Sequence, residues 1–277
     1  MNKEHRKVEW SFDFENLRVR AGQFVSDMMG GEVEAKRASL QEERGEATSA
    51  SIQIDFSVGR ATVSALDAGS ANLFQAELKY IGEYEYEVSG GAERVISLRQ
   101  KGSFPRDLAV MAGNARDLHW DIALAQNLPL KLRLKGGIGE SEIDLSRLQV
   151  ENFKLETGLG QVTLTTPLQE SRFAGEVNGG VGKTEVTIPA SCRGRLKIAG
   201  GVGEVRVSVA PGAALRVTGK TGLGQVNLPA GFKRLEGGGK QTSGVWESPG
   251  FADADNQILI NYEGGVGSFS LAYFDIL

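Results

Sequence analysis

The sequence predicts an all-β protein whose second half is a parallel β-solenoid of about seven coils, each of ~21 residues. Three observations predict this fold. Glycine is abundant, with 37 copies among 277 residues, and the excess serves turns because glycine weakens helices and strands. A glycine–aliphatic–glycine triplet recurs at a nearly constant step, and apolar residues alternate with polar ones between the triplets. A fixed period of this length indicates stacked repeats.

The triplet sets the length of one coil. Successive copies are 21, 22, 21, 21 and 43 residues apart, and the midpoint of the last gap holds a degenerate copy, Gly244-Val245-Trp246. The regular copies are Gly137-Ile138-Gly139, Gly158-Leu159-Gly160, Gly180-Val181-Gly182, Gly201-Val202-Gly203, Gly222-Leu223-Gly224 and Gly265-Val266-Gly267.

Each period has the pattern of two strands joined by a bend. After the triplet, apolar residues occupy every second position, as in Val205, Val207 and Val209, which is the periodicity of a strand with one buried face. Proline often follows and marks the end of the strand, because it cannot donate to a ladder. A second alternating run, such as Leu196-Lys197-Ile198, leads to the next triplet. This pattern argues against helical repeats.

Stacked coils place equivalent residues in columns. Lys183 is expected beside Glu204 in an outward column, which favours this register because like charges placed opposite each other destabilise a sheet. The full outward column is expected to be Glu140, Gln161, Lys183, Glu204, Gln225, Glu247 and Ser268. The triplet aliphatics are expected to form an inward column: Ile138, Leu159, Val181, Val202, Leu223, Val245 and Val266.

The N-terminal half is divided at residues 50 and 115. Residues 1–50 are expected to form an arm, with a short amphipathic helix or irregular arm over residues 8–29 and one strand near Val33–Leu40. Residues 51–115 are expected to form a β-rich module, and residues 58–64 echo residues 181–187. This module either caps or extends the solenoid of residues 116–277, and Phe269, Tyr273 and Phe274 are expected to close the other end.

Composition narrows the functional classes. The net charge of −4 argues against a nucleic-acid-binding protein, which usually needs a basic surface. The single cysteine, Cys192, cannot form an internal disulfide, so nothing calls for an oxidising compartment. No signal-peptide core follows the charged start, and no window approaches the roughly 18 apolar residues of a membrane span. A cytoplasmic protein without an integral membrane segment is therefore expected.

A run of aromatic and aliphatic residues leads into the first triplet. It reads Trp120-Asp121-Ile122-Ala123-Leu124, then Leu128-Pro129-Leu130-Lys131-Leu132, and then residues 137–148, which end in Ile143-Asp144-Leu145-Ser146-Arg147-Leu148. This order resembles bacterial toast-rack domain proteins, over residues 50–277. The same pattern occurs in the C-terminal domains of LiaF-like cell-envelope stress proteins and in proteins loosely described as adhesins. The resemblance implies a solenoid linked to the cell envelope, and it implies no catalytic residues.

No motif for a reaction, a metal or a cofactor stands out, so no catalytic, cofactor-binding or metal-binding residue is assigned. Gly182-Lys183-Thr184 lacks the earlier glycine and the following helix of a phosphate-binding loop. The triplets lack the aspartates of calcium-binding β-rolls. Four further features are interpreted as structural: His119 with Asp121, the lone thiol of Cys192, the Glu83/Glu85/Glu87 strip, and the Asp253/Asp255 pair.

These observations predict a non-catalytic interaction or scaffold protein, with the link to the cell envelope implied by the resemblance. A protein partner or self-association through a solenoid face or an end strand is expected, and a glycan is a second class of ligand. Two alternatives stay open. One is a carbohydrate-active β-helix enzyme, a lyase or hydrolase, and the other is a regulator that binds a sensor kinase.

Overall fold

The computed structural model describes residues 35–101, 117–169, 172–190, 192–237 and 242–274. The arm over residues 8–29 and the connection over residues 102–116 lie outside the described residues. The described strands are β1 (Lys36–Glu43), β2 (Ser49–Ala65), β3 (Asn72–Tyr80), β4 (Glu83–Ser89), β5 (Glu93–Lys101), β6 (His119–Leu124), β7 (Leu130–Asp144), β8 (Val150–Thr165), β9 (Phe173–Asn178), β10 (Val181–Ile188), β11 (Gly194–Val209), β12 (Ala214–Leu223), β13 (Val226–Asn227), β14 (Lys233–Glu236), β15 (Ser243–Glu247) and β16 (Gln257–Tyr273), with a short 3₁₀ turn, η1 (Phe251–Asp253).

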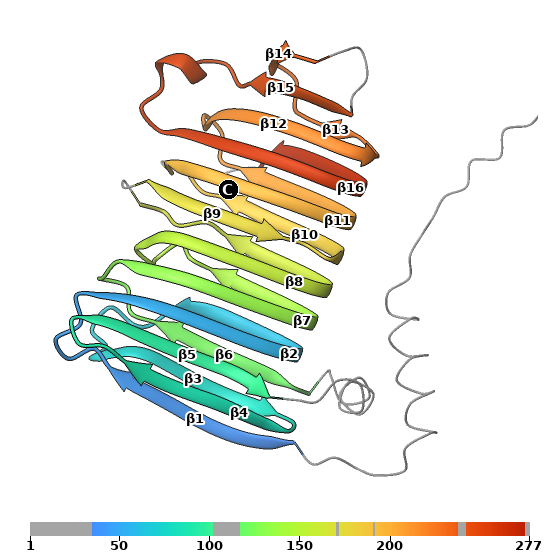
Figure 1. Ribbon diagram of the computed structural model, residues 1–277. Coiled ribbons are helices and arrows are strands. Elements are labelled where there is room, and N and C mark those ends of the chain that lie inside the picture. Colours follow the sequence, from blue (N-terminus) through green and yellow to red (C-terminus); the bar gives the residue numbers. More distant parts are fainter. Residues whose placement is uncertain (1–34, 102–116, 170–171, 191, 238–241, 275–277) are drawn as a thin grey trace, which may run out of the picture.

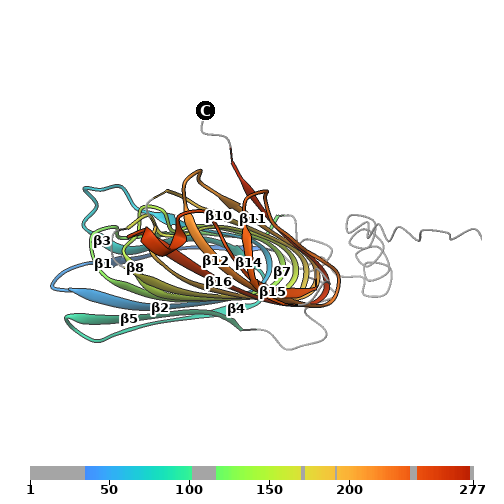
Figure 2. The same ribbon diagram turned by 90° about the horizontal axis from the view of Figure 1, so that it is seen from above.

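The strands stack as bent rungs, which confirms the predicted all-β and mainly parallel fold (Figure 1). In a rung such as β8, residues before the triplet belong to a first sheet layer and residues after it belong to a second layer. The two layers meet at the bends and enclose one apolar core (Figure 2). Side chains alternate along each strand, so that Phe153 and Leu155 in the first layer and Val162 and Leu164 in the second layer all point into this core.

The N-terminal module both extends and caps the stack. Strand β2 is a full rung, because Val58 and Gly59 pair in parallel with Ile138 and Gly139 of β7. Beyond β2, the antiparallel pair β5–β4 continues the first layer, and β6, β3 and β1 continue the second layer. The echo between residues 58–64 and 181–187 thus reflects a shared rung structure. The division of the chain at residues 50 and 115 stays a prediction, and the sheet runs on without a break from β2 to β7.

The C-terminal end corrects the expected order of rungs. Strand β16 lies between β11 and β12, so Val202 stacks on Val266, which stacks on Leu223. The degenerate triplet forms no parallel rung, because β15 pairs antiparallel with β12 and places Val245 opposite Thr218. Neither do Phe269 and Tyr273 close the end of the stack, since they belong to β16. A long apolar edge strand invites association, and inserting β16 leaves the much shorter β15 and β14 at this end.

The expected inward column of triplet aliphatics is wrong. Leu159 is 48% exposed and Leu223 is 70% exposed, and Val202 and Val266 are also exposed. These residues sit at the apex of the bend between the layers, where a side chain points away from the core that the layers enclose. The neighbouring outward column is confirmed from Glu140 through Gln161 and Lys183 to Glu204. Because β16 is inserted, the column continues through Ser268 to Gln225, whereas Glu247 pairs with Arg216 instead.

Candidate binding surface

The outer side of the first layer carries a cluster of positive charge. On β7 the buried residues Leu130, Leu132 and Leu134 alternate with outward Lys131, Arg133 and Lys135. The outward positions of β8 and β11 add Lys154, Arg195 and Lys197. We call these six residues the basic face. The carboxylates on the same side of β7, β8, β9 and β11 are Glu151, Glu156 and Glu176, so this surface is positive although the chain has a net charge of −4.

Strand pairing brings these side chains into rows across the rungs. One row runs Gln53, Arg133, Lys154, Glu176 and Lys197 over β2, β7, β8, β9 and β11. The neighbouring row runs Ser51, Lys131, Asn152, Ala174 and Arg195 over the same strands. Paired strands lie about 4.8 Å apart, so polar groups repeat at that step along the stacking axis.

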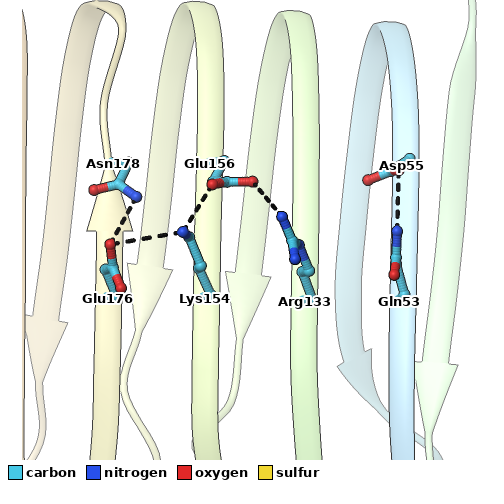
Figure 3. A network of polar contacts seen from close by, with 7 residues as sticks. All are labelled: Gln53, Asp55, Arg133, Lys154, Glu156, Glu176 and Asn178. Atoms are coloured by element: carbon cyan, nitrogen blue, oxygen red, sulfur yellow. Dashed lines mark hydrogen bonds and ion pairs between the residues drawn. The ribbon is translucent and has the colours of Figure 1, made fainter.

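The centre of the face is held by a network of ion pairs (Figure 3). Glu156 lies between two cations, with Oε1 2.9 Å from Lys154 Nζ and Oε2 3.4 Å from Arg133 Nη2. Lys154 Nζ also lies 3.8 Å from Glu176 Oε1, which accepts a hydrogen bond of 2.9 Å from Asn178 Nδ2. The hydrogen bond from Lys154 lowers the pKa of Glu156 and correspondingly raises the pKa of Lys154, so both groups stay charged around neutral pH.

The rest of the basic face is unpaired. Within the described residues, no carboxylate oxygen lies within 4 Å of Lys131, Lys135, Arg195 or Lys197. The outer side of the second layer differs. There Arg60 pairs with Glu140 at 3.2 Å, Lys183 with Glu185 at 2.6 Å and Arg206 with Glu204 at 3.0 Å. On the outer side of the first layer, four cations thus have no ion pair within the described residues and can bind an anion. Toward β1, the second layer also places Arg37 beside Lys79, and neither forms an ion pair within the described residues.

A groove of about 530 Å³ crosses the basic face from β5 to β11. Its lining includes the cations Lys131, Arg133, Lys154 and Lys197 and the neutral polar residues Ser51, Gln53, Ser97 and Asn152. Glu176 is the carboxylate in the lining. Such a surface can bind an anion by charge and can bind neutral hydroxyl groups through amide, hydroxyl and carboxylate groups.

His119 and Asp121 lie on the outer side of the second layer. His119 Nε2 is 3.8 Å from Asp121 Oδ2, and both side chains are substantially exposed. Asp121 also accepts a hydrogen bond of 2.9 Å from Thr62 Oγ1 on the neighbouring strand. The pair is thus part of the polar surface of β6 and β2, well separated in the fold from the basic face on the first layer.

The acidic strip on β4 is neutralised by β5. Glu85 lies 2.9 Å from Lys101 Nζ and 3.1 Å from Arg99 Nη2, and Glu87 lies 3.7 Å from Arg99 Nη2. The hydrogen bond from Lys101 lowers the pKa of Glu85. These contacts account for the strip as cross-strand pairing.

The remaining features considered in the sequence do not assemble into a site. Asp253 and Asp255 are exposed around η1, and Lys183 and Thr184 lie inside strand β10 instead of at a helix start. Among the described residues, no group of three or more His, Cys, Asp and Glu gathers in a way that could hold a metal ion. In the same part of the chain, no helix has the length and apolar character required to cross a bilayer.

Cys192 is expected to resist thiol reagents in the folded protein. Its side chain is buried, Sγ donates to the Pro167 carbonyl oxygen at 3.0 Å, and burial raises its pKa to about 11. The thiolate is the reactive form, so labelling with a chromogenic disulfide at pH 8 should be slow in buffer and fast in urea. Equal rates in the two conditions would show that the thiol is accessible.

The raised pKa of Cys192 also predicts that the free energy of unfolding falls as the pH rises above neutral. The ordinary thiol pKa is about 8.5, so the folded state holds the proton more tightly than the unfolded state does. The buried thiol therefore contributes fully to the free energy of unfolding below the unfolded-state pKa of about 8.5. This contribution is lost as the pH rises toward the folded-state pKa of about 11. A Cys192→Ala variant should show a smaller loss of unfolding free energy than the parent over this pH range.

Comparison with known proteins shows the family. A family model described as the N-terminal domain of toast_rack, DUF2154, matches residues 5–187. The chain belongs to the toast-rack family. Its resemblance to toast-rack proteins is thereby confirmed, and the matched segment starts and ends earlier than residues 50–277, over which the resemblance was expected. No curated protein matches this toast-rack chain significantly.

One of two similar solved structures shows the same fold. A candidate cell adhesion protein from Clostridium sporogenes is 23% identical, with a TM-score of 0.58 over 87% of this chain and 100% of that chain. A candidate adhesin from Bacteroides fragilis is 10% identical, with a TM-score of 0.35 over 88% of this chain and 100% of that chain. The first of these supports the toast-rack architecture, and the second similarity is too low to carry an argument.

The outward column expected from the sequence does not contain the basic face, because that column follows the triplets and lies on the second layer. The signal was present in Leu130-Lys131-Leu132-Arg133-Leu134-Lys135 and Arg195-Leu196-Lys197, where each outward position of a strand is a cation. Only the pairing of β7, β8, β9 and β11 shows that these runs lie side by side.

Proposed function

We propose that this toast-rack protein is a non-catalytic interaction protein of the bacterial cell envelope, and that its basic face binds an anionic partner. The observation that carries the proposal is a group of exposed cations on one side of the stack, Lys131, Lys135, Arg195 and Lys197, which have no carboxylate partner among the residues that the structure describes. An anion bound across these cations would supply the counter-charge that the described residues do not supply within ion-pair distance. Membership of the toast-rack family and a fold shared with a candidate cell adhesion protein support the proposal.

The proposal predicts binding to bacterial cell walls that keep their anionic polymers. Purified walls should sediment the full-length protein at low salt, and added salt should weaken the binding because exposed charges are screened. Lys131→Glu/Lys197→Glu should weaken binding at least about tenfold, which corresponds to about 1.4 kcal/mol. The matched control is Lys79→Glu/Lys233→Glu, which makes the same change of net charge away from the basic face.

The control variant should sediment as the parent does. Failure of the parent protein to sediment, or equal sedimentation of both double variants, would contradict the proposal. The isolated proteins should also have matching urea unfolding curves, because all four substituted lysines have side chains outside the core.

A carbohydrate-active enzyme is the second candidate function, because some solenoid lyases and hydrolases also bind substrate in a charged groove. The groove here contains one lining carboxylate, Glu176, and that group is already paired with Lys154 at 3.8 Å. This arrangement lacks the two converging carboxylates that most glycoside hydrolases use. The test is prolonged incubation with acidic polysaccharides, followed by measurement of new reducing ends and of unsaturated products. Either product would show an enzyme, and intact polysaccharide is the result expected of a binding protein.

A further inference from the structure

The rows of the basic face have a chemistry and a direction that point to a more specific ligand. We infer that the face binds a linear acidic polysaccharide, with the chain lying along the stacking axis from β7 to β11 and its carboxylates against the free cations. This inference rests on the proposed function and adds the class of ligand and its orientation.

The direction follows from the rows. Lys131 and Arg195 are the outermost cations of one row, and Arg133 and Lys197 are the outermost cations of the other. Between these cations, from β7 to β11, each row crosses three strand-to-strand steps of about 4.8 Å, or roughly 14 Å in all. Each sugar unit of an extended chain advances by a distance comparable to one strand-to-strand step. The carboxylates of an acidic polysaccharide laid across the rungs therefore repeat with a spacing similar to that of the strands.

The class of ligand follows from what lies between the cations. Asn152 and Gln53 supply amide groups, and Ser51 and Ser97 supply hydroxyls. The Gln53 Nε2 donates to Asp55 Oδ2 at 3.2 Å, which leaves the Gln53 amide oxygen to accept from a sugar hydroxyl. Glu156 and Glu176 are acceptor-only carboxylates within the face. Sugar hydroxyls can donate to these carboxylates, whereas polyphosphate has only acceptors and would be repelled by them.

The outward residues of the first layer also help to distinguish a sugar ligand from a nucleic acid. On the described first-layer parts of β2, β7, β8, β9 and β11, the outward positions hold no aromatic side chain. Binding of single-stranded nucleic acid normally relies on stacking of bases on aromatic rings, so the face does not suit that ligand. The mixture of free cations, amides and carboxylates favours an acidic sugar chain instead.

The test is binding of the full-length protein to oligogalacturonates of defined length, measured by calorimetry at fixed salt. Galacturonate monomer should bind at least tenfold more weakly than an oligomer long enough to span β7 to β11, and affinity should level off beyond that length. Lys131→Glu/Lys197→Glu should lose at least tenfold in affinity for the long oligomer, and Lys79→Glu/Lys233→Glu should not.

A second pair of probes separates a sugar ligand from any polyanion. Polyphosphate and poly-glutamate of equal charge should bind more weakly than the oligogalacturonate, and Gln53→Ala/Asn152→Ala should weaken oligogalacturonate binding while leaving polyphosphate binding unchanged. Equal or tighter binding of polyphosphate, or affinity independent of length, would overturn the inference and leave the anionic binding surface in place. Failure to bind any of the polyanions, together with failure to sediment with cell walls, would overturn the proposed function as well.

Discussion

Replacing Gly182 by valine is expected to lower the free energy of unfolding by about 3 kcal/mol or more and to reduce the yield of folded protein. Two causes act together. The φ of Gly182 is +144°, a conformation that L side chains rarely adopt. A Cβ at this position would also lie 1.8 Å from the carbonyl oxygen of Gly160 on the next rung, and that oxygen is backbone and cannot move away.

The control for this substitution is Thr187→Val on the same strand. Thr187 is a partly exposed outward residue of β10, so its replacement should change the free energy of unfolding by no more than about 0.5 kcal/mol. Gly203→Val should repeat the effect of Gly182→Val, since Gly203 has a φ of +140° and its Cβ would lie 1.8 Å from the Gly182 carbonyl oxygen. Urea unfolding followed by circular dichroism measures all three. Equal midpoints for the glycine and threonine variants would refute the stacked register.

Leu164→Ala is the second substitution with a large expected effect. Leu164 is fully buried between the layers, and truncating a buried leucine costs about 2–5 kcal/mol through lost apolar contact and the cavity that remains. Leu159 lies on the same strand, β8, and is 48% exposed at the bend. Leu159→Ala should therefore cost no more than about 0.5 kcal/mol.

The two leucines make a matched pair, because they have the same side chain on one strand, and Leu164 lies in the core whereas Leu159 lies at the outside of the bend. The free energies of unfolding from urea titration should differ by at least about 1.5 kcal/mol. A result in which Leu159→Ala is as costly as Leu164→Ala would support the inward column expected from sequence and contradict the bend geometry.

The register of the central rungs was readable from the sequence. Lys183 lies opposite Glu204 because the triplets recur at 21 or 22 residues and each triplet bends the chain in the same way. The rung at Gly59 was readable as well, from its likeness to the rung at Gly182. Local repetition is sufficient here, because equivalent rungs pair directly with one another.

The sequence did not predict correctly whether the aliphatic side chains of the triplets point into the core or away from it. Alternation along a strand predicts which side of a sheet a residue faces, but a bend with positive φ interrupts the alternation at each triplet. Leu159 therefore lies outside the bend although it is an aliphatic residue in a repeated column. The position of β16 could not be predicted either, because the sequence shows the order of rungs along the chain and not their order in the sheet.

By itself, the sequence determined that this protein is built of β rungs bent at glycines, since only glycine tolerates the positive φ and the close backbone approach that the bend requires. It also determined which residues of β7 and β11 face outward, since that follows from alternation. Only the tertiary structure decided that β16 separates β11 from β12 and that Lys131 and Lys197 share one groove. The physical reason is that hydrogen bonding between strands far apart along the chain depends on which edges are left unpaired, and no local pattern records that choice.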